Sequence, residues 1–183
     1  MTRFELGDTH DEALLAEVLA VADELEAAGR LSLCRDFMQH GQFSVYAHVV
    51  HVAFESLRLV ERFGWQVDRA SLVRGALLHD YFLYDWHEPQ PNDPLGISGY
   101  THPWTALRNA EEDFDLTPVE RNVIVRHMWP LTVIPPACRE GWVVTLADKV
   151  CALRETVVGH APARLAGRLP GWSVGAARQV LGK

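Results

Sequence analysis

Apolar residues recur with the period of an α-helix along nearly the whole chain, and no segment shows the two-residue alternation of a strand. Over residues 11–28 the apolar positions form one stripe, and Gly29 follows as a stop signal. The pattern returns over 44–63 before Gly64, and again after Asp68, which can cap a third helix. Without internal repeats, the 183 residues are expected to fold as an all-α, single-domain helical bundle.

Two stretches rich in Pro separate the later helices from one another. Residues 84–99 contain three Pro and two Gly, which predicts a loop, and a loop of this length is typical of a functional lid. Thr117, Pro118 and Glu120 form a capping box with Pro in the first turn. The other elements are expected in this order: a helix from 101 to about 114, a helix from 117 to about 128, a loop with Pro130, Pro135 and Pro136, a helix from 140 to about 158, and one or two short helices after 161.

Acidic residues outnumber basic ones, with 24 Asp and Glu against 17 Lys and Arg and a formal net charge of −7. This balance argues against a broad surface for nucleic-acid polymers or anionic membranes, both of which need clustered basic residues. It leaves open a small phosphorylated substrate held by a few local cations. No apolar run approaches the ~18 residues that indicate a membrane span.

The three cysteines, Cys34, Cys138 and Cys151, are an odd number without CxxC spacing. This pattern favours reduced, buried thiols over a disulfide framework or a zinc ribbon. The first eight residues lack the basic region and apolar core of a signal peptide. We therefore expect a cytoplasmic protein.

His79 and Asp80 directly follow the apolar run that ends the third predicted helix. Asp80 continues the stripe of Val73, Ala76 and Leu77, so its carboxylate is expected to face the core. A buried carboxylate beside a buried imidazole indicates either an ion pair or a metal site, because an isolated buried polar group is costly.

Four further polar side chains fall on inward helix faces: His48, His102, His127 and Asp148. His102 stands at a predicted helix start, and Asp148 lies in the middle of a helix, where an unpaired carboxylate is hard to tolerate. Each of them alone is most simply a hydrogen-bonded core histidine or a capped aspartate. The whole set favours a metal site.

The ordered set resembles the HD-domain superfamily of metal-dependent phosphohydrolases, in its binuclear branch. The matching segments are Tyr-Ala-His-Val-Val-His-Val-Ala over 46–53, Ala-Leu-Leu-His-Asp over 76–80 and Leu-Ala-Asp-Lys over 146–149, and the resemblance spans about 44–156. It implies one metal held by His48, His79, Asp80 and Asp148, and a second held by Asp80, His102 and His127. His51 then supports a ligand or packs in the core. The metals would be two divalent transition ions, from Fe, Mn, Ni, Co or Zn.

The resemblance implies a phosphomonoesterase or phosphodiesterase that acts on a nucleotide or small phosphate ester through a metal-bound hydroxide. Leu83 stands where many binuclear members carry Lys, and the GYP signature of cyclic-dinucleotide phosphodiesterases is absent. A cyclic-di-GMP phosphodiesterase is therefore disfavoured. Two alternatives stay open: a mixed-valence di-iron oxygenase of the same fold, and a non-catalytic metal- or ligand-binding module.

Catalytic roles beyond the ligands fall to a few candidates, with Asp80 expected to bridge the metals. Lys149, Arg126, Arg108 and Arg154 lie beside ligands or on their helices and can bind phosphate, although solvated charge or a salt bridge is an equally good explanation for the three arginines. In the 84–99 loop, His87 with Asp85 can supply a general acid or cap the loop. The tryptophans near ligand motifs, which can wall a pocket for a ring or fill the core, are Trp86, Trp104 and Trp129.

Overall fold

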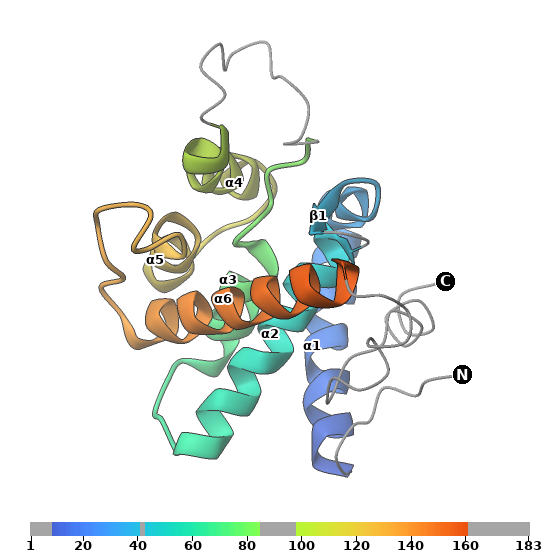
Figure 1. Cartoon of the computed structure of the whole chain (residues 1–183), viewed down its shortest axis with the longest axis vertical. Helices are drawn as coiled ribbons and strands as arrows, with labels where there is room; N and C mark the ends of the chain where they lie inside the picture. Colours follow the sequence, from blue (N-terminus) through green and yellow to red (C-terminus); the bar gives the residue numbers. More distant parts are fainter. Residues whose placement is uncertain (1–8, 41–42, 85–97, 161–183) are drawn as a thin grey trace.

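The computed structural model describes residues 9–40, 43–84 and 98–160, and helices dominate them. Figure 1 shows the arrangement, with α6 crossing α2 and α3 near the centre of the molecule and α4 and α5 to one side. The elements are α1 (Thr9–Ala28), the 3₁₀ helix η1 (Leu31–Arg35), β1 (Met38–His40), β2 (Phe43–Ser44), α2 (Val45–Phe63), α3 (Arg69–Leu78), α4 (Ser98–Asp113), α5 (Pro118–Arg126) and α6 (Arg139–His160). The predicted all-α bundle is confirmed.

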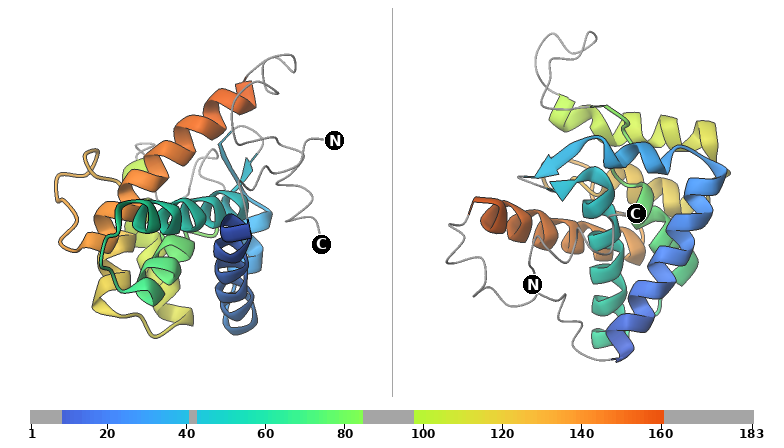
Figure 2. Two further views of the ribbon diagram at one scale, coloured as in Figure 1. Left: turned by 90° about the horizontal axis from the view of Figure 1, so that it is seen from below. Right: turned by 90° about the vertical axis from the view of Figure 1, so that its right-hand side faces the viewer.

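Helix α2 is the central element of the bundle, and it packs against α1, α3 and α6 (Figure 2). It begins where the Ser44 side chain accepts a hydrogen bond from the backbone N–H of Ala47, and it ends at Gly64, whose φ of 63° suits glycine. Most of its residues are buried, because neighbours cover it on several sides. His48 and His51 therefore lie inside the protein.

The predicted caps of α3 and α5 are also confirmed. The Asp68 carboxylate accepts a hydrogen bond from the N–H of Ser71 at 3.2 Å. Thr117 and Glu120 exchange hydrogen bonds in a capping box at the start of α5, with Pro118 at the first helical position. These caps fix where α3 and α5 begin, and so where their C-terminal ends present His79 and His127.

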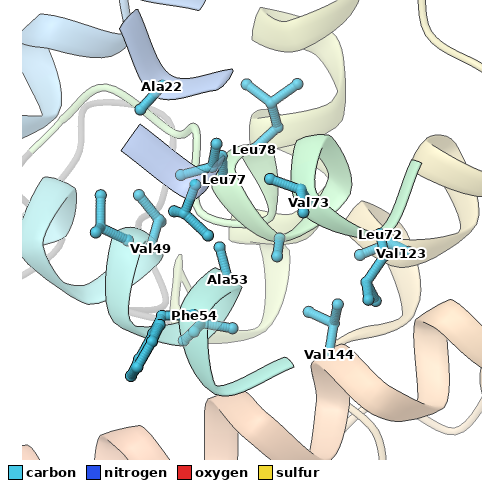
Figure 3. Close-up of a cluster of buried hydrophobic side chains, with 14 of the residues drawn as sticks. Ala22, Val49, Ala53, Phe54, Leu72, Val73, Leu77, Leu78, Val123 and Val144 are labelled. Atoms are coloured by element: carbon cyan, nitrogen blue, oxygen red, sulfur yellow. The ribbon is translucent and has the colours of Figure 1, made fainter. Parts of the chain in front are cut away.

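The apolar core lies where α2, α3, α5 and α6 meet, next to those C-terminal ends (Figure 3). Fully burying each large aliphatic side chain contributes about 1.5–3 kcal/mol. The core residues that Figure 3 labels are Ala22, Val49, Ala53, Phe54, Leu72, Val73, Leu77, Leu78, Val123 and Val144. This packing sets the relative positions of the helices that carry the candidate ligands.

The structure differs from the sequence-based expectations at two places. Strands β1 and β2 pair in a two-stranded antiparallel ribbon that was not predicted. Strands of three and two residues are too short to show alternation in the sequence. Helix α4 begins at Ser98, not after Thr101, so the predicted position of His102 at a helix start is wrong. Pro103, the residue after His102, lies inside the helix.

Some predictions concern residues outside those that the structure describes. These are the 84–99 loop from residue 85 to 97, with Asp85, Trp86 and His87, and the short helices after 161. Of the helices that are described, none combines the length and apolarity that a membrane crossing requires.

Candidate metal centre

The six candidate ligands come together in the protein interior, and none of them is more than 9% exposed. The helices place these side chains close together, and three of the six residues come just after the last residue of a helix. His48 comes from α2, His79 and Asp80 follow α3, His102 comes from α4, His127 follows α5 and Asp148 comes from α6. The structure thus brings the six predicted residues together in one place.

One group of donor atoms surrounds Asp148 Oδ1. This oxygen lies 3.2 Å from His48 Nε2 and 3.9 Å from His79 Nε2. Asp80 Oδ2 lies 3.4 Å from the same His79 atom and 3.8 Å from the His48 atom. His48, His79 and Asp148 thus place donor atoms close enough together to share a metal ion.

A second group surrounds the other oxygen of Asp80. Oδ1 lies 3.2 Å from His102 Nε2 and 3.4 Å from His127 Nε2, and these two nitrogens are 3.1 Å apart. The Asp80 carboxylate therefore presents Oδ2 to one pair of histidines and Oδ1 to another. This is the arrangement in which a carboxylate can bridge two cations.

The tautomers of two histidines are set by helix ends. Nδ1 of His79 donates to the Ala76 carbonyl at 2.7 Å, and Nδ1 of His127 donates to the Ile124 carbonyl at 2.8 Å. Because a carbonyl oxygen only accepts, the neutral rings carry their proton on Nδ1 and leave Nε2 with a lone pair. Within the described residues, His79 Nε2 and Asp80 Oδ1 are buried without a hydrogen-bond partner. Such orphaned acceptors fit a bound cation.

Glu155 is a site residue that sequence reasoning missed. Its carboxylate accepts a hydrogen bond from His48 Nδ1 at 2.8 Å and from His51 Nδ1 at 3.0 Å. Glu155 lies seven residues after Asp148, which is two helical turns along the same face of α6, and this spacing was a usable signal. The contact orients His48, and it gives His51 the supporting role expected from the sequence.

Gln39 is the second residue that sequence reasoning missed. Its Nε2 donates to Asp80 Oδ2 at 2.6 Å from the two-stranded ribbon, and the side chain is buried. The hydrogen bond fixes the orientation of the Asp80 carboxylate. Nothing in the local sequence pattern indicated this contact, because the ribbon itself was not predicted.

The charge state of Asp80 follows from the histidines around it. Burial alone would raise the pKa of this carboxyl, but His79, His102 and His127 hold the pKa well below its usual range. Burial lowers the pKa of His127 to about 4, so this imidazole is neutral at pH 7. An ionised carboxylate beside a neutral imidazole is the protonation pattern that metal ligation requires.

His48 and Asp148 form the opposite side of the centre. Burial opposes the charge on the His48 ring, but Glu155 and Asp148 raise its pKa well above the usual value. Burial likewise opposes ionisation of Asp148, while His48, His79 and Lys149 lower its pKa. These interactions keep the carboxylate ionised and available as a ligand.

Lys149 contacts the centre directly. Its Nζ donates to Asp148 Oδ2 at 2.7 Å and to the His127 carbonyl at 3.3 Å. Arg154, another of the basic candidates, donates to the Glu55 carboxylate at 2.7 Å and not to a candidate ligand. Lys149 also lines a cavity of about 500 Å³ beside α6.

Leu83, at the position where many binuclear HD proteins carry Lys, packs against the hydrophobic core. Its φ of 56° lies in the left-handed region, which costs a residue with a β-carbon about 1–2 kcal/mol. The Asn109 side chain holds this turn by donating to the carbonyls of Tyr81 and Phe82, both at 3.0 Å. Lys149, which comes from α6, places a cationic side chain against the centre.

No protein-family model, curated protein or solved structure matches the chain.

Proposed function

We propose that this protein is a metal-dependent phosphohydrolase that acts on a small phosphorylated compound such as a nucleotide. The observation that carries the proposal is the position of Asp80, whose two oxygens face separate groups of histidine Nε2 atoms. Paired sites of this kind serve in-line phosphoryl displacement, because each cation stabilises one of the oxygens that enter or leave.

The residues present fit two divalent ions. His48, His79, Asp80 and Asp148 would hold one ion, and Asp80, His102 and His127 the other. Imidazole and carboxylate donors suit Fe, Mn, Co, Ni or Zn. When bound, such ions lower the pKa of water and withdraw charge from phosphoryl oxygens.

The protein holds the donor atoms in place through hydrogen bonds behind them. Backbone carbonyls orient His79 and His127, Glu155 orients His48, and Gln39 orients Asp80. A centre whose side chains are locked in this way loses little free energy to reorganisation during a reaction.

Lys149 supplies the positive charge that a phosphoryl group requires. An ammonium group has three donors, and the contacts with Asp148 and His127 use two of them. The third can bind a phosphoryl oxygen next to the centre. This contact strengthens as negative charge builds on that oxygen, so it favours the transition state over the ground state.

The experiment that tests the proposal is a phosphate-release assay over a panel of nucleotides and simple phosphate esters, in Mn²⁺, Fe²⁺, Co²⁺, Ni²⁺ and Zn²⁺. We expect at least one metal-dependent activity, reduced at least ~100-fold in Asp80→Asn, which keeps the shape of the side chain. His10→Ala is the control, because His10 is an exposed residue of α1 outside the centre.

The same protein samples separate the two alternatives. Oxygen uptake by the iron-loaded protein, without phosphate release from any panel member, would contradict the phosphohydrolase proposal and support an oxygenase. Tight metal binding with neither activity would leave a non-catalytic metal-binding module.

A further inference from the structure

Beside the candidate metal centre lies a cavity of about 500 Å³ with aromatic walls. Trp65 comes from the segment between α2 and α3, Trp129 from the segment between α5 and α6, and Trp142 from α6. Of the tryptophans singled out in the sequence, Trp129 lines the cavity, whereas Trp104 is not among its lining residues and is 59% exposed.

The walls are preformed and open to solvent. The rings of Trp129 and Trp142 meet edge to face, with centroids 4.9 Å apart and an angle of 72°. Trp142 is nevertheless 44% exposed, and Leu146 one turn later is 47% exposed. Large apolar side chains that stay exposed around a concavity mark a binding surface more often than scattered single residues do.

One end of the cavity is polar and adjoins the metal centre. Lys149 lines the cavity and also bonds to Asp148 at 2.7 Å. Thr145, one turn before Lys149, lines it too. A cation thus lies at the end nearest the candidate ligands.

The size and chemistry of the cavity fit a small molecule. Volumes of ~300–1,000 Å³, apolar walls and a few convergent polar groups are typical of ligand sites. Tryptophan walls favour a flat ring, which can stack on one ring or meet it at the edge. Lys149 favours an anion at the polar end, so the complementary compound has a flat apolar body and one negative group.

We propose that this cavity binds an aromatic anion, with its ring among Trp65, Trp129 and Trp142 and its anionic group at Lys149. Combined with the proposed function, on which this step rests, the cavity selects phosphate esters of aromatic or heterocyclic compounds over small aliphatic esters. The phosphoryl group lies at Lys149 beside Asp148, and the ring occupies the cavity.

The first arm of the test is calorimetric binding of naphthalene-1-sulfonate to the Mn²⁺-loaded protein, which needs no turnover. Leu146→Glu places a carboxylate in the cavity and should weaken binding at least tenfold. Leu153→Glu is the matched control, because Leu153 lies on the same helix, is 67% exposed and does not line the cavity. This control should bind the sulfonate within twofold of the wild type.

Lys149→Met tests the anionic end. It should weaken binding of naphthalene-1-sulfonate at least fivefold and leave binding of neutral 1-naphthol within twofold. Equal losses for the two compounds would overturn the assignment of the anionic group to Lys149.

The second arm compares hydrolysis of 1-naphthyl phosphate with that of methyl phosphate. Leu146→Glu should raise the KM for the naphthyl ester at least tenfold and several times more than the KM for methyl phosphate, because only the naphthyl ring lies in the cavity beside residue 146. If neither ester is hydrolysed, the proposed function fails, while the calorimetry still decides whether the cavity binds aromatic anions.

Three results would overturn the proposal whatever the activity. The first is a wild-type protein that does not bind the sulfonate, and the second is a Leu146→Glu variant that binds it as well as the wild type does. The third is self-association of the wild type, abolished by Leu146→Glu, in a protein that does not bind the sulfonate. That result would assign this face to a second copy of the chain.

Discussion

The Nε2 atoms of His102 and His127 lie 3.1 Å apart, although His102 belongs to α4 and His127 directly follows α5. Since Nδ1 of His127 donates to a backbone carbonyl, its Nε2 has only a lone pair to offer. In the hydrogen bond between them His102 Nε2 is therefore the donor, and a divalent ion bound by these two nitrogens and Asp80 Oδ1 would take the place of that proton.

The first prediction concerns this second group of donors. His102→Ala and His127→Ala should each lower the metal content from about two ions per chain towards one, because the group around Asp148 keeps its own ligands. Elemental analysis after gel filtration measures the content. His10→Ala should retain both ions. An unchanged metal content in both His102→Ala and His127→Ala would indicate a centre with a single ion.

The second prediction concerns Glu155. Glu155→Gln removes the charge that orients His48 and His51, so it should weaken metal affinity by roughly 10–100-fold. Metal titration followed by calorimetry measures this change. Folding alone does not explain such a loss if the metal-free variant unfolds at the same denaturant concentration as its control.

The control for Glu155 is Glu140→Gln on the same helix. Glu140 is also buried, and its carboxylate accepts a hydrogen bond from the backbone N–H of Asp68 at 2.7 Å, away from the metal centre. Its substitution should lower the free energy of unfolding without changing metal affinity. Equal metal affinities in the two variants would contradict the role given to Glu155.

The third prediction concerns Lys149. Lys149→Met should lower kcat by about 100-fold for any phosphate ester that the protein hydrolyses, because it removes the ammonium group beside the phosphoryl position. The metal content should stay the same, since Lys149 is not itself a ligand. Arg154→Met on the same helix is the matched control, because Arg154 pairs with Glu55 and its removal should leave kcat unchanged.

The fourth prediction concerns the support beneath the metal centre. Asp113 accepts hydrogen bonds from Tyr81 Oη at 2.7 Å and from Arg30 Nε at 2.8 Å, and Tyr81 directly follows the His79–Asp80 pair. Asp113→Asn should lower the free energy of unfolding by about 1–3 kcal/mol at pH 7. Glu112→Gln removes an exposed ion pair with the same arginine, so urea unfolding should show a loss of less than about 0.5 kcal/mol.

The effect of Asp113 should depend on pH. Burial would raise the pKa of this carboxyl, but Arg30 and Tyr81 lower the pKa below its ordinary value of 3.8. A carboxyl group whose pKa is lower in the folded state stabilises the fold fully at pH values above its ordinary pKa. This contribution is lost as the pH falls through the folded-state pKa. The difference between wild type and Asp113→Asn should therefore be constant from pH 7 to about 5 and shrink below pH 3.8. A difference that grows on acidification would contradict this assignment.

Sequence periodicity predicted the helices and their inward faces because it reports burial. The stripe through Val73, Ala76 and Leu77 indicated that Asp80 would be buried, and the caps at Asp68 and Thr117 marked where two ligand helices begin. Local rules of this kind do not specify which helix ends meet in space. The meeting of His102 with His127 comes from the packing of α4 on α5, which depends on the whole core.

The residues that sequence reasoning missed are those that act through a ligand. Glu155 could have been found from its two-turn spacing to Asp148, but Gln39 reaches Asp80 from a ribbon too short to recognise. The start of α4 was placed a few residues too late, since α4 begins at Ser98 and carries Pro103 inside the helix. Side chains that orient ligands depend on tertiary contacts, and periodicity does not encode those contacts.

The most direct test of the central claim is anomalous X-ray diffraction from crystals grown with Mn²⁺ or Fe²⁺. The predicted result is two anomalous peaks ~3.5–4 Å apart, one on each side of the Asp80 carboxylate, with His48, His79 and Asp148 at one peak and His102 and His127 at the other. A single peak would contradict the paired centre. Peaks that lie away from Asp80, or none at all, would contradict the metal site itself.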